Sequence, residues 1–275
     1  MNANATNNNN SSPRISVVMG IYNCEATLER AVESIISQTY QDWELIMCDD
    51  ASTDNTYQLA CELAKRDNRI TVLRNEKNIG CNVVLNRCIE LARGKYIAVM
   101  DSDDISLPKR LEREVKILDK NPQYSIVSSA TKHFDENGDF MTIRRKERPQ
   151  PTDFVCGIPH AHGACMIRAK VLKEIGCYIT AKRLKRVEDY YMMACIYALG
   201  YRGYNIQEIL YKVHDNREAY DRRTWSNRIN EVYTYNKTYK LLRLSLIHRI
   251  MLIRPLLVGM LPRPIYNFLH RRPWA

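Results

Sequence analysis

Two groups of closely spaced aspartates are the residues whose types and spacing most directly suggest chemistry. Asp49 and Asp50 end one apolar run, and residues 101–104, which read DSDD, end another. Carboxylates this close repel one another, so they destabilise a fold unless a cation or hydrogen-bond donors offset the charge. Mg²⁺ and Mn²⁺ take one or two carboxylates together with phosphate oxygens and water. An acidic turn that caps the next helix is the alternative, and the spacing alone fits both.

The elements that must position these aspartates are predicted from hydrophobic patterning. Short β-branched runs alternate with amphipathic stretches, which indicates an α/β fold with an open, mostly parallel sheet and helices on both faces. In such sheets ligands bind beyond the carboxyl ends of the strands, where both acidic groups fall. The expected strands are 14–19, 43–48, 70–73, 95–100 and 124–129, the expected helices are 25–37, 53–67, 80–93 and 109–119, and a loop or hairpin is expected over 134–152.

The composition indicates a sizeable core followed by a basic C-terminal segment. Of the 275 residues, 45% are hydrophobic, which suits one catalytic domain with an appendage. The net charge of +10 comes mainly from residues 216–275, which hold 12 Lys and Arg against 3 Asp and Glu. Because the remainder is nearly neutral, the charge argues against a nucleic-acid binder and for contact of the C-terminal segment with an anionic membrane surface.

The cysteines and the N-terminus suggest a cytoplasmic protein. The nine cysteines include no CxxC pair, which favours reduced thiols over a disulfide framework or a zinc site. Residues 1–13 are polar and of low complexity, so we expect a disordered lead-in. This lead-in lacks the basic start and apolar stretch of a signal peptide.

Residues 14–115 resemble the catalytic core of the family 2 glycosyltransferases, which have the Rossmann-like GT-A fold. The resemblance rests on three segments in the family's order and at about its spacing: SVVMGIYNCEATLERAVESIISQTYQDWELIMCDDASTDNT, RNEKNIGCNVVLN and GKYIAVMDSDDISLPKRLE. It implies an inverting transfer of a sugar from a nucleotide diphosphate donor, expected to be a UDP-sugar, with Mn²⁺ or Mg²⁺ as the cofactor. Surface polysaccharide or glycolipid assembly is the implied pathway.

The resemblance also implies a nucleotide-binding set in the first half of the chain. The turn from Gly20 to Tyr22 and the Asp50 carboxylate would hold the nucleotide base. Asn78 and Gly80, in the loop before the third expected helix, would line the nucleotide pocket.

In the DSDD run, the resemblance assigns a different role to each of two aspartates. Asp101 would contact the ribose or diphosphate, and Asp103 would bind the metal. For Asp104, capping of the next helix is the preferred interpretation. His214 resembles a recurrent late histidine of the family that approaches the metal or diphosphate, with an ordinary surface histidine as the alternative.

An inverting transfer needs a base that takes the proton of the acceptor hydroxyl. The family resemblance implies an acidic residue that opens a downstream helix, and Asp189 fits, with Glu188 as its orienting neighbour or substitute. Carboxylates at a helix start are also favoured by the helix dipole alone, which is the alternative. His160 and His162 could line the acceptor or be structural, and the basic run 182–186 could attract phosphates or form a solvated face.

Residues 238–275 are expected to lie on a membrane surface without spanning it. Arginines such as Arg249 and Arg254 interrupt the apolar runs, none of which reaches the roughly 18 residues of a spanning helix. Helical segments broken near Pro255 or Pro262 suit interfacial attachment. The protein would then be peripheral on the inner face of the cell membrane, beside a glycan or polyprenyl-linked acceptor. A helix packed on the catalytic domain and an oligomer contact are the alternatives.

We therefore predict a catalytic domain over 14–215, with a donor-binding half (14–115) and an acceptor-binding half (116–215), followed by a basic tail over 216–275. A non-catalytic nucleotide-sugar-binding subunit or membrane scaffold is one rival interpretation. A nucleotidyltransferase is another, although such enzymes more usually begin with a Gly-rich, basic phosphate loop, which is missing here.

Overall fold

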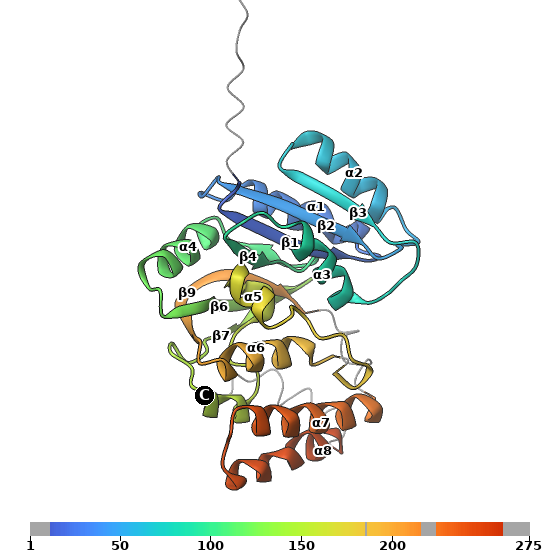
Figure 1. Ribbon diagram of the computed structural model, residues 1–275. Helices are drawn as coiled ribbons and strands as arrows, with labels where there is room; N and C mark the ends of the chain where they lie inside the picture. Colours follow the sequence, from blue (N-terminus) through green and yellow to red (C-terminus); the bar gives the residue numbers. More distant parts are fainter. Residues whose placement is uncertain (1–11, 185, 216–223, 261–275) are drawn as a thin grey trace, which may run out of the picture.

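A computed structural model describes residues 12–184, 186–215 and 224–260 (Figure 1). Within these residues the strands form one nine-stranded sheet in the order β3-β2-β1-β4-β8-β6-β9-β5, and β7 pairs with β6. The strands are β1 (Ile15–Ile21), β2 (Trp43–Asp49), β3 (Ile70–Arg74), β4 (Tyr96–Val99), β5 (Ile105–Ser106), β6 (Tyr124–Asp135), β7 (Gly138–Ile143), β8 (Met166–Arg168) and β9 (Arg202–His214). The α-helices are α1 (Glu25–Ile36), α2 (Thr56–Arg66), α3 (Cys81–Leu91), α4 (Arg110–Lys120), α5 (Ala169–Glu174), α6 (Glu188–Ala198), α7 (Trp225–Leu241) and α8 (Arg254–Gly259).

The predicted α/β class is confirmed, and the sheet changes character along its width. Strands β3, β2, β1 and β4 are parallel, with each expected helix of residues 25–120 present between or after them. Beyond β4, β8 runs antiparallel to both β4 and β6, while β6 and β9 are parallel and β5 is antiparallel to β9. The sheet is therefore mixed beyond β4, in contrast to the mostly parallel sheet that patterning predicted.

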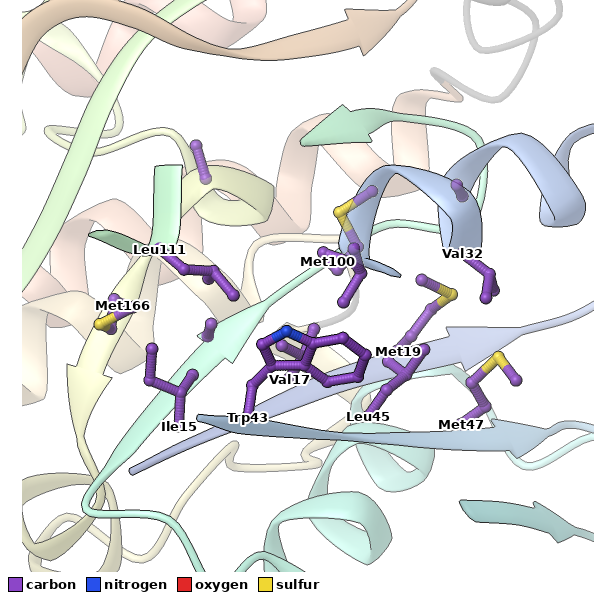
Figure 2. Packing of buried hydrophobic residues seen from close by; sticks show 14 of the residues in the cluster. Ile15, Val17, Met19, Val32, Trp43, Leu45, Met47, Met100, Leu111 and Met166 are labelled. Carbon is purple, nitrogen blue, oxygen red and sulfur yellow. The ribbon is translucent and has the colours of Figure 1, made fainter. Parts of the chain in front are cut away.

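Alternate side chains of the central strands face two separate cores. In β1, Val17 and Met19 pack with Trp43 of β2 beneath α1, α2 and α4 (Figure 2). Val18 points the other way and packs with Ile46 against α3, α5 and α6. Burial of each such side chain stabilises the fold by about 1.5–3 kcal/mol. Because both faces of the sheet are covered, the carboxyl edge of the parallel strands is left as the exposed end of the domain.

The C-terminal helix α7 packs directly on the catalytic domain, which was one alternative for the tail. The ring of Tyr235 in α7 lies 4.8 Å from the ring of Tyr190 in α6, and Tyr239 is buried. The following 3₁₀ segment Leu246–Ile253 and α8 instead leave large apolar side chains exposed. These exposed side chains are Leu246, Ile247, Ile250, Ile253, Leu257 and Met260.

Among the residues described, no helix combines the length and the apolar character needed to cross a bilayer. Residues 1–11 of the expected lead-in, and 216–223 and 261–275 of the expected tail, lie outside the described part of the chain.

Candidate active site

Asp50 fixes the loop that leads into α3. Its Oδ1 accepts hydrogen bonds from Nδ2 of Asn75 (2.7 Å) and the backbone N–H of Ile79 (2.9 Å), and its Oδ2 accepts from the N–H of Gly80 (2.9 Å). Gly80 precedes the first residue of α3 and has a φ of 95°, which favours glycine. The structure thus brings two of the expected nucleotide-binding residues into direct contact, while the side chain of Asn78 in the same loop is exposed.

The turn after β1 lies beside the start of α3. A Cβ atom on Gly20 would stand 3.2 Å from Cγ1 of Val84, a tight contact, so Gly20 gives room for the first turn of the helix. Tyr22 is 47% exposed at the same end of the sheet. Both positions agree with the expected location of the site at the carboxyl edge.

A cavity of about 340 Å³ adjoins the Asp50 loop. It is lined by Ala51, Arg74, Asn75 and Glu76. Nε of Arg74 lies 3.2 Å from Oδ2 of Asp49, so one of the two strand-end aspartates neutralises this guanidinium. The cavity therefore combines amide, cationic and anionic groups at the end of β2 and β3.

The three aspartates of the DSDD turn have different surroundings. Burial raises the pKa of Asp101, and the charges of Asp103 and Asp189 raise it further, whereas His162 opposes this shift. Asp103 is 43% exposed. Asp104 is buried, and its Oδ1 accepts the backbone N–H of His214 at 2.7 Å.

The expectation that Asp104 caps the next helix is therefore wrong. Helix α4 begins at Arg110, and the residue before it is Lys109, which makes no side-chain cap. The carboxylate of Asp104 instead binds the end of β9, a long-range contact that helix patterning does not reveal.

His214 and Asp103, the two expected metal ligands, lie together. Nδ1 of His214 is 3.7 Å from Oδ2 of Asp103, and this buried nitrogen has no hydrogen-bond partner among the described residues. Over the same residues, no group of three or more His, Cys, Asp or Glu side chains is arranged to hold a metal. An ion here would thus take two protein ligands and complete its coordination with phosphate oxygens and water.

The first turn of α6 carries the expected base at the same end of the sheet. Oδ1 of Asp189 accepts the N–H of Tyr190 at 2.7 Å. Burial raises the pKa of Glu188, and a hydrogen bond from the Asn82 side chain of α3 opposes the shift. Glu188 is thus held against the first turn of α3.

Cys81 shows that the separate acidic groups meet. The thiol is exposed, yet many protein atoms surround it, and this burial raises its pKa to about 12. Four carboxylates add to the shift: those of Asp101, Glu188, Asp50 and Asp189. These carboxylates come from segments far apart in the sequence, so the fold gathers them near the start of α3. Sequence reasoning had treated this cysteine as a small apolar residue and missed its location.

The two histidines of the 160–162 segment have different roles. His160 is fully buried between Asn205 and Tyr197, and burial lowers its pKa to about 4, so it is a neutral structural residue. His162 is partly exposed near Asp101, and its Nε2 lies 2.7 Å from the hydroxyl of Tyr178. Of the alternatives left open, full burial favours the structural one for His160, whereas His162 lies near Asp101.

Tyr178 and Tyr211 support the site and carry no sequence signal of their own. Both backbone polar groups of Tyr178 are hydrogen-bonded to Asn86 of α3. The hydroxyl of Tyr211 in β9 accepts the N–H of Asp101 at 3.2 Å. In the basic run, the Arg183 guanidinium lies over the ring of Tyr233, whereas the side chain of residue 182 and all of residue 185 lie outside the described part.

A parallel α/β half that ends in aspartates, joined to a mixed half that brings His214 and Asp189 to the same edge, defines a GT-A glycosyltransferase. The fold is shared with the mannosyltransferase PcManGT of Pyrobaculum calidifontis, solved with GDP-Man and Mn²⁺. The TM-score is 0.64 at 19% identity, over 95% of this chain and 79% of that one. The chain belongs to Glycosyl transferase family 2, whose family pattern matches residues 16–176.

Two relatives agree with this assignment over most of their length. EpsE of Bacillus subtilis (strain 168), which is named as a putative glycosyltransferase, is 38% identical over 264 residues, or 96% of this chain and 95% of EpsE. WfaP of Escherichia coli, a UDP-Glc:α-D-GlcNAc-diphosphoundecaprenol β-1,3-glucosyltransferase, is 26% identical over 86% of this chain and 89% of WfaP. Family membership sets aside the nucleotidyltransferase alternative.

Proposed function

We propose that this enzyme transfers a hexosyl or N-acetylhexosaminyl group, with inversion, from a UDP-sugar to a lipid-linked glycan acceptor in polysaccharide biosynthesis. The observation that supports it best is the meeting of four carboxylates around Cys81 at the start of α3. These come from the ends of two parallel strands and the start of α6. Groups suited to a nucleotide, a diphosphate and an attacking hydroxyl are thereby gathered near the start of α3.

The donor nucleotide is proposed to bind between the Asp50 loop and the cavity at Arg74. Asp50 already accepts three hydrogen bonds, but a carboxylate has about four lone-pair sites, so one remains for a base N–H. Gly20 and Tyr22 would border the same pocket, with Asn78 and Gly80 on its other side. Asp101, deeper in the turn, would contact the ribose or diphosphate.

The cation is proposed to lie at Asp103 and His214, because the free Nδ1 faces the carboxylate and both fit a divalent ion. When bound, Mn²⁺ or Mg²⁺ would neutralise charge that develops on the departing diphosphate. The protein contribution is to hold the two ligands on different segments, the DSDD turn and the end of β9.

Asp189 is the proposed base. Its carboxylate would take the proton of the acceptor hydroxyl as that oxygen forms a bond to the anomeric carbon. The bond from this carbon to the donor phosphate oxygen breaks at the same time, and its electron pair leaves with the nucleotide diphosphate. Glu188 accepts a hydrogen bond from the Asn82 side chain, which supports an orienting role for Glu188 and the role of base for Asp189.

The acceptor is proposed to be bound to a membrane lipid. WfaP acts on a GlcNAc-diphosphoundecaprenol, and this chain exposes an apolar face at its C-terminal end. This face carries Leu246, Ile247 and Ile250, and basic or titratable residues lie among and after them: His248, Arg249 and Arg254. Insertion of the apolar side chains and attraction to anionic headgroups would therefore act together. This supports a peripheral position on the inner face of the cell membrane.

The deciding experiment uses the purified full chain with UDP-, GDP- and dTDP-sugars and a GlcNAc-diphosphopolyprenyl acceptor, in Mn²⁺ or in EDTA. We expect one UDP-sugar to give product and UDP, in Mn²⁺ only, and the reaction to be lost in Asp189→Asn. Absence of both nucleotide binding and turnover across the panel would favour a non-catalytic subunit and overturn the proposal.

A further inference from the structure

The buried carboxylate of Asp104 joins two segments that are 110 residues apart in the chain. Its Oδ1 accepts the backbone N–H of His214 at 2.7 Å, and the Tyr211 hydroxyl also hydrogen-bonds to this carboxylate. The same hydroxyl accepts the N–H of Asp101. The Tyr211 oxygen therefore lies between the beginning and the end of the DSDD turn.

Tyr211 is itself held firmly. It is fully buried, and the guanidinium of Arg110 lies 4.8 Å from its ring centroid. Arg110 donates to the carbonyl of Val99 at the end of β4 and pairs with Glu114 at 3.3 Å. Since β4 leads into the DSDD turn, the tyrosine is anchored to the same strand whose turn it supports.

The two segments that Asp104 and Tyr211 join are those that carry Asp103 and His214. Oδ2 of Asp103 and Nδ1 of His214 are 3.7 Å apart, too far for a hydrogen bond. Adjacent ligands about 2.1 Å from one octahedral ion lie about 3 Å apart, so a small inward rotation of the two side chains would let both reach a shared cation. His214 is the last residue of β9, whereas Asp103 lies in the turn before β5, so their separation depends on how this turn is held against the end of β9.

We propose that Asp104 and Tyr211 are positioning residues that hold Asp103 and His214 close enough to share one divalent cation. They set the affinity of the site for the ion more than the rate of transfer. This inference rests on the proposed metal-dependent function, and it goes beyond that function by assigning the cause of the ligand spacing to two buried side chains.

The test compares Tyr211→Phe and Asp104→Asn with Lys212→Gln as a matched control on β9. The backbone of Lys212 pairs with Ile105 of β5, but its Nζ pairs with Asp139 of β7 at 2.9 Å, so this control changes a side chain that contacts β7. For each protein we would measure Mn²⁺ binding by titration in the presence of UDP, thermal unfolding in EDTA, and kcat at saturating Mn²⁺.

We expect the Mn²⁺ dissociation constant to rise roughly 10-fold or more in both variants, the usual effect of losing a supporting contact to a metal ligand. The value of kcat at saturating Mn²⁺ should stay near that of the wild type, and Lys212→Gln should match the wild type throughout. Because Tyr211→Phe keeps the ring, it tests the proposal even if Asp104→Asn does not fold.

An unchanged Mn²⁺ constant with a lower unfolding temperature would show that the two residues only stabilise the fold, which overturns the proposal. Wild-type protein that binds no Mn²⁺ with UDP and transfers sugar in EDTA would instead overturn the metal-dependent function and this inference with it. If the wild type binds Mn²⁺ and both variants bind it equally well, the positioning role of Asp104 and Tyr211 is overturned while the metal-dependent function stands.

Discussion

Gly163 lies against Asp101 so closely that a Cβ atom at Gly163 would stand 2.7 Å from the carboxylate Oδ2. The same atom would stand 2.8 Å from the Tyr211 hydroxyl. The segment after His162 therefore approaches the DSDD turn closely because it lacks a side chain at this position. Glycine is required here for space.

Gly163→Ala should reduce transfer more than it reduces stability. The added methyl displaces the ends of two side chains in the site, and overpacking of this kind costs about 1–3 kcal/mol. Gly94→Ala is the contrast, because its Cβ would meet the backbone N of Ser16 at 2.5 Å, far from the site. Steady-state rates should fall more in Gly163→Ala, and the temperature of thermal unfolding should fall more in Gly94→Ala. If Gly163→Ala and Gly94→Ala lost the same activity and unfolded at the same temperature, the prediction would be contradicted.

Asp103→Asn should abolish metal-dependent transfer, because the exposed carboxylate is the proposed ligand with a full charge. We expect a fall of about 100-fold or more in kcat/KM, partly restored at high Mn²⁺. Rates measured over a Mn²⁺ series, with Asp139→Asn as an unrelated surface control, would test this. Near-normal turnover at low Mn²⁺ would remove Asp103 from the metal site.

Asp189→Asn should lower kcat by about 10²–10⁴-fold, the usual contribution of a general base, while the donor still binds. Glu188→Gln should have a smaller effect, because Glu188 is proposed to orient its neighbour and already accepts a hydrogen bond from the Asn82 side chain. Single-turnover rates together with UDP binding would separate the two roles. A larger fall in kcat for Glu188→Gln than for Asp189→Asn would make Glu188 the base and Asp189 its orienting neighbour.

Charged substitutions on the exposed C-terminal face should release the protein from membranes. Ile247→Glu with Ile250→Glu places carboxylates on a face that is proposed to meet anionic headgroups, and both side chains are at least 68% exposed. Sedimentation with anionic vesicles should fall, while thermal unfolding should not change. Leu91→Glu, an exposed site on α3, is the matched control.

Deletion of residues 238–275 should also reduce vesicle binding, but with a loss of stability. Thr238 and Tyr239 are buried against the catalytic domain, so this truncation removes part of its packing. A truncated protein that still sediments with vesicles would indicate another membrane contact.

The stability should fall on acidification below about pH 6.5 because His160 is buried in its neutral form. Its pKa is about 4 in the fold and about 6.5 when unfolded, so the unfolded state binds more protons between these values. The loss amounts to about 3 kcal/mol once the pH is below both pKa values. His160→Gln should be less stable near neutrality and should lack this part of the pH dependence.

Unfolding by urea at several pH values would compare the two proteins. Burial raises the pKa of Glu114 to about 7 in spite of Arg110, so Glu114 contributes stability that is lost as the pH rises and opposes the slope from His160. The difference between wild type and variant isolates His160. Parallel pH curves would contradict its assignment as a neutral buried group.

Much of the donor half was predictable because its elements follow local patterns. The alternation of strands and helices over residues 14–120 gives their order, and the parallel strands then place Asp50 and Asp101 at one edge. The parts that were not predicted depend on β9. Its pairing between β6 and β5 brings Tyr211 and the backbone of His214 to the DSDD turn, and no periodicity in the sequence reports a contact over that distance.

Strand β5 belongs to the first half of the chain but pairs with β9, across the sheet from its neighbours in sequence. A cut between residues 115 and 116 would therefore separate two pieces that each lack a strand partner supplied by the other. Recombination between two relatives at that point would join the DSDD turn of one enzyme to the β9 strand of the other. Productive chimaeras of such enzymes should therefore exchange residues 105–106 and 202–214 together.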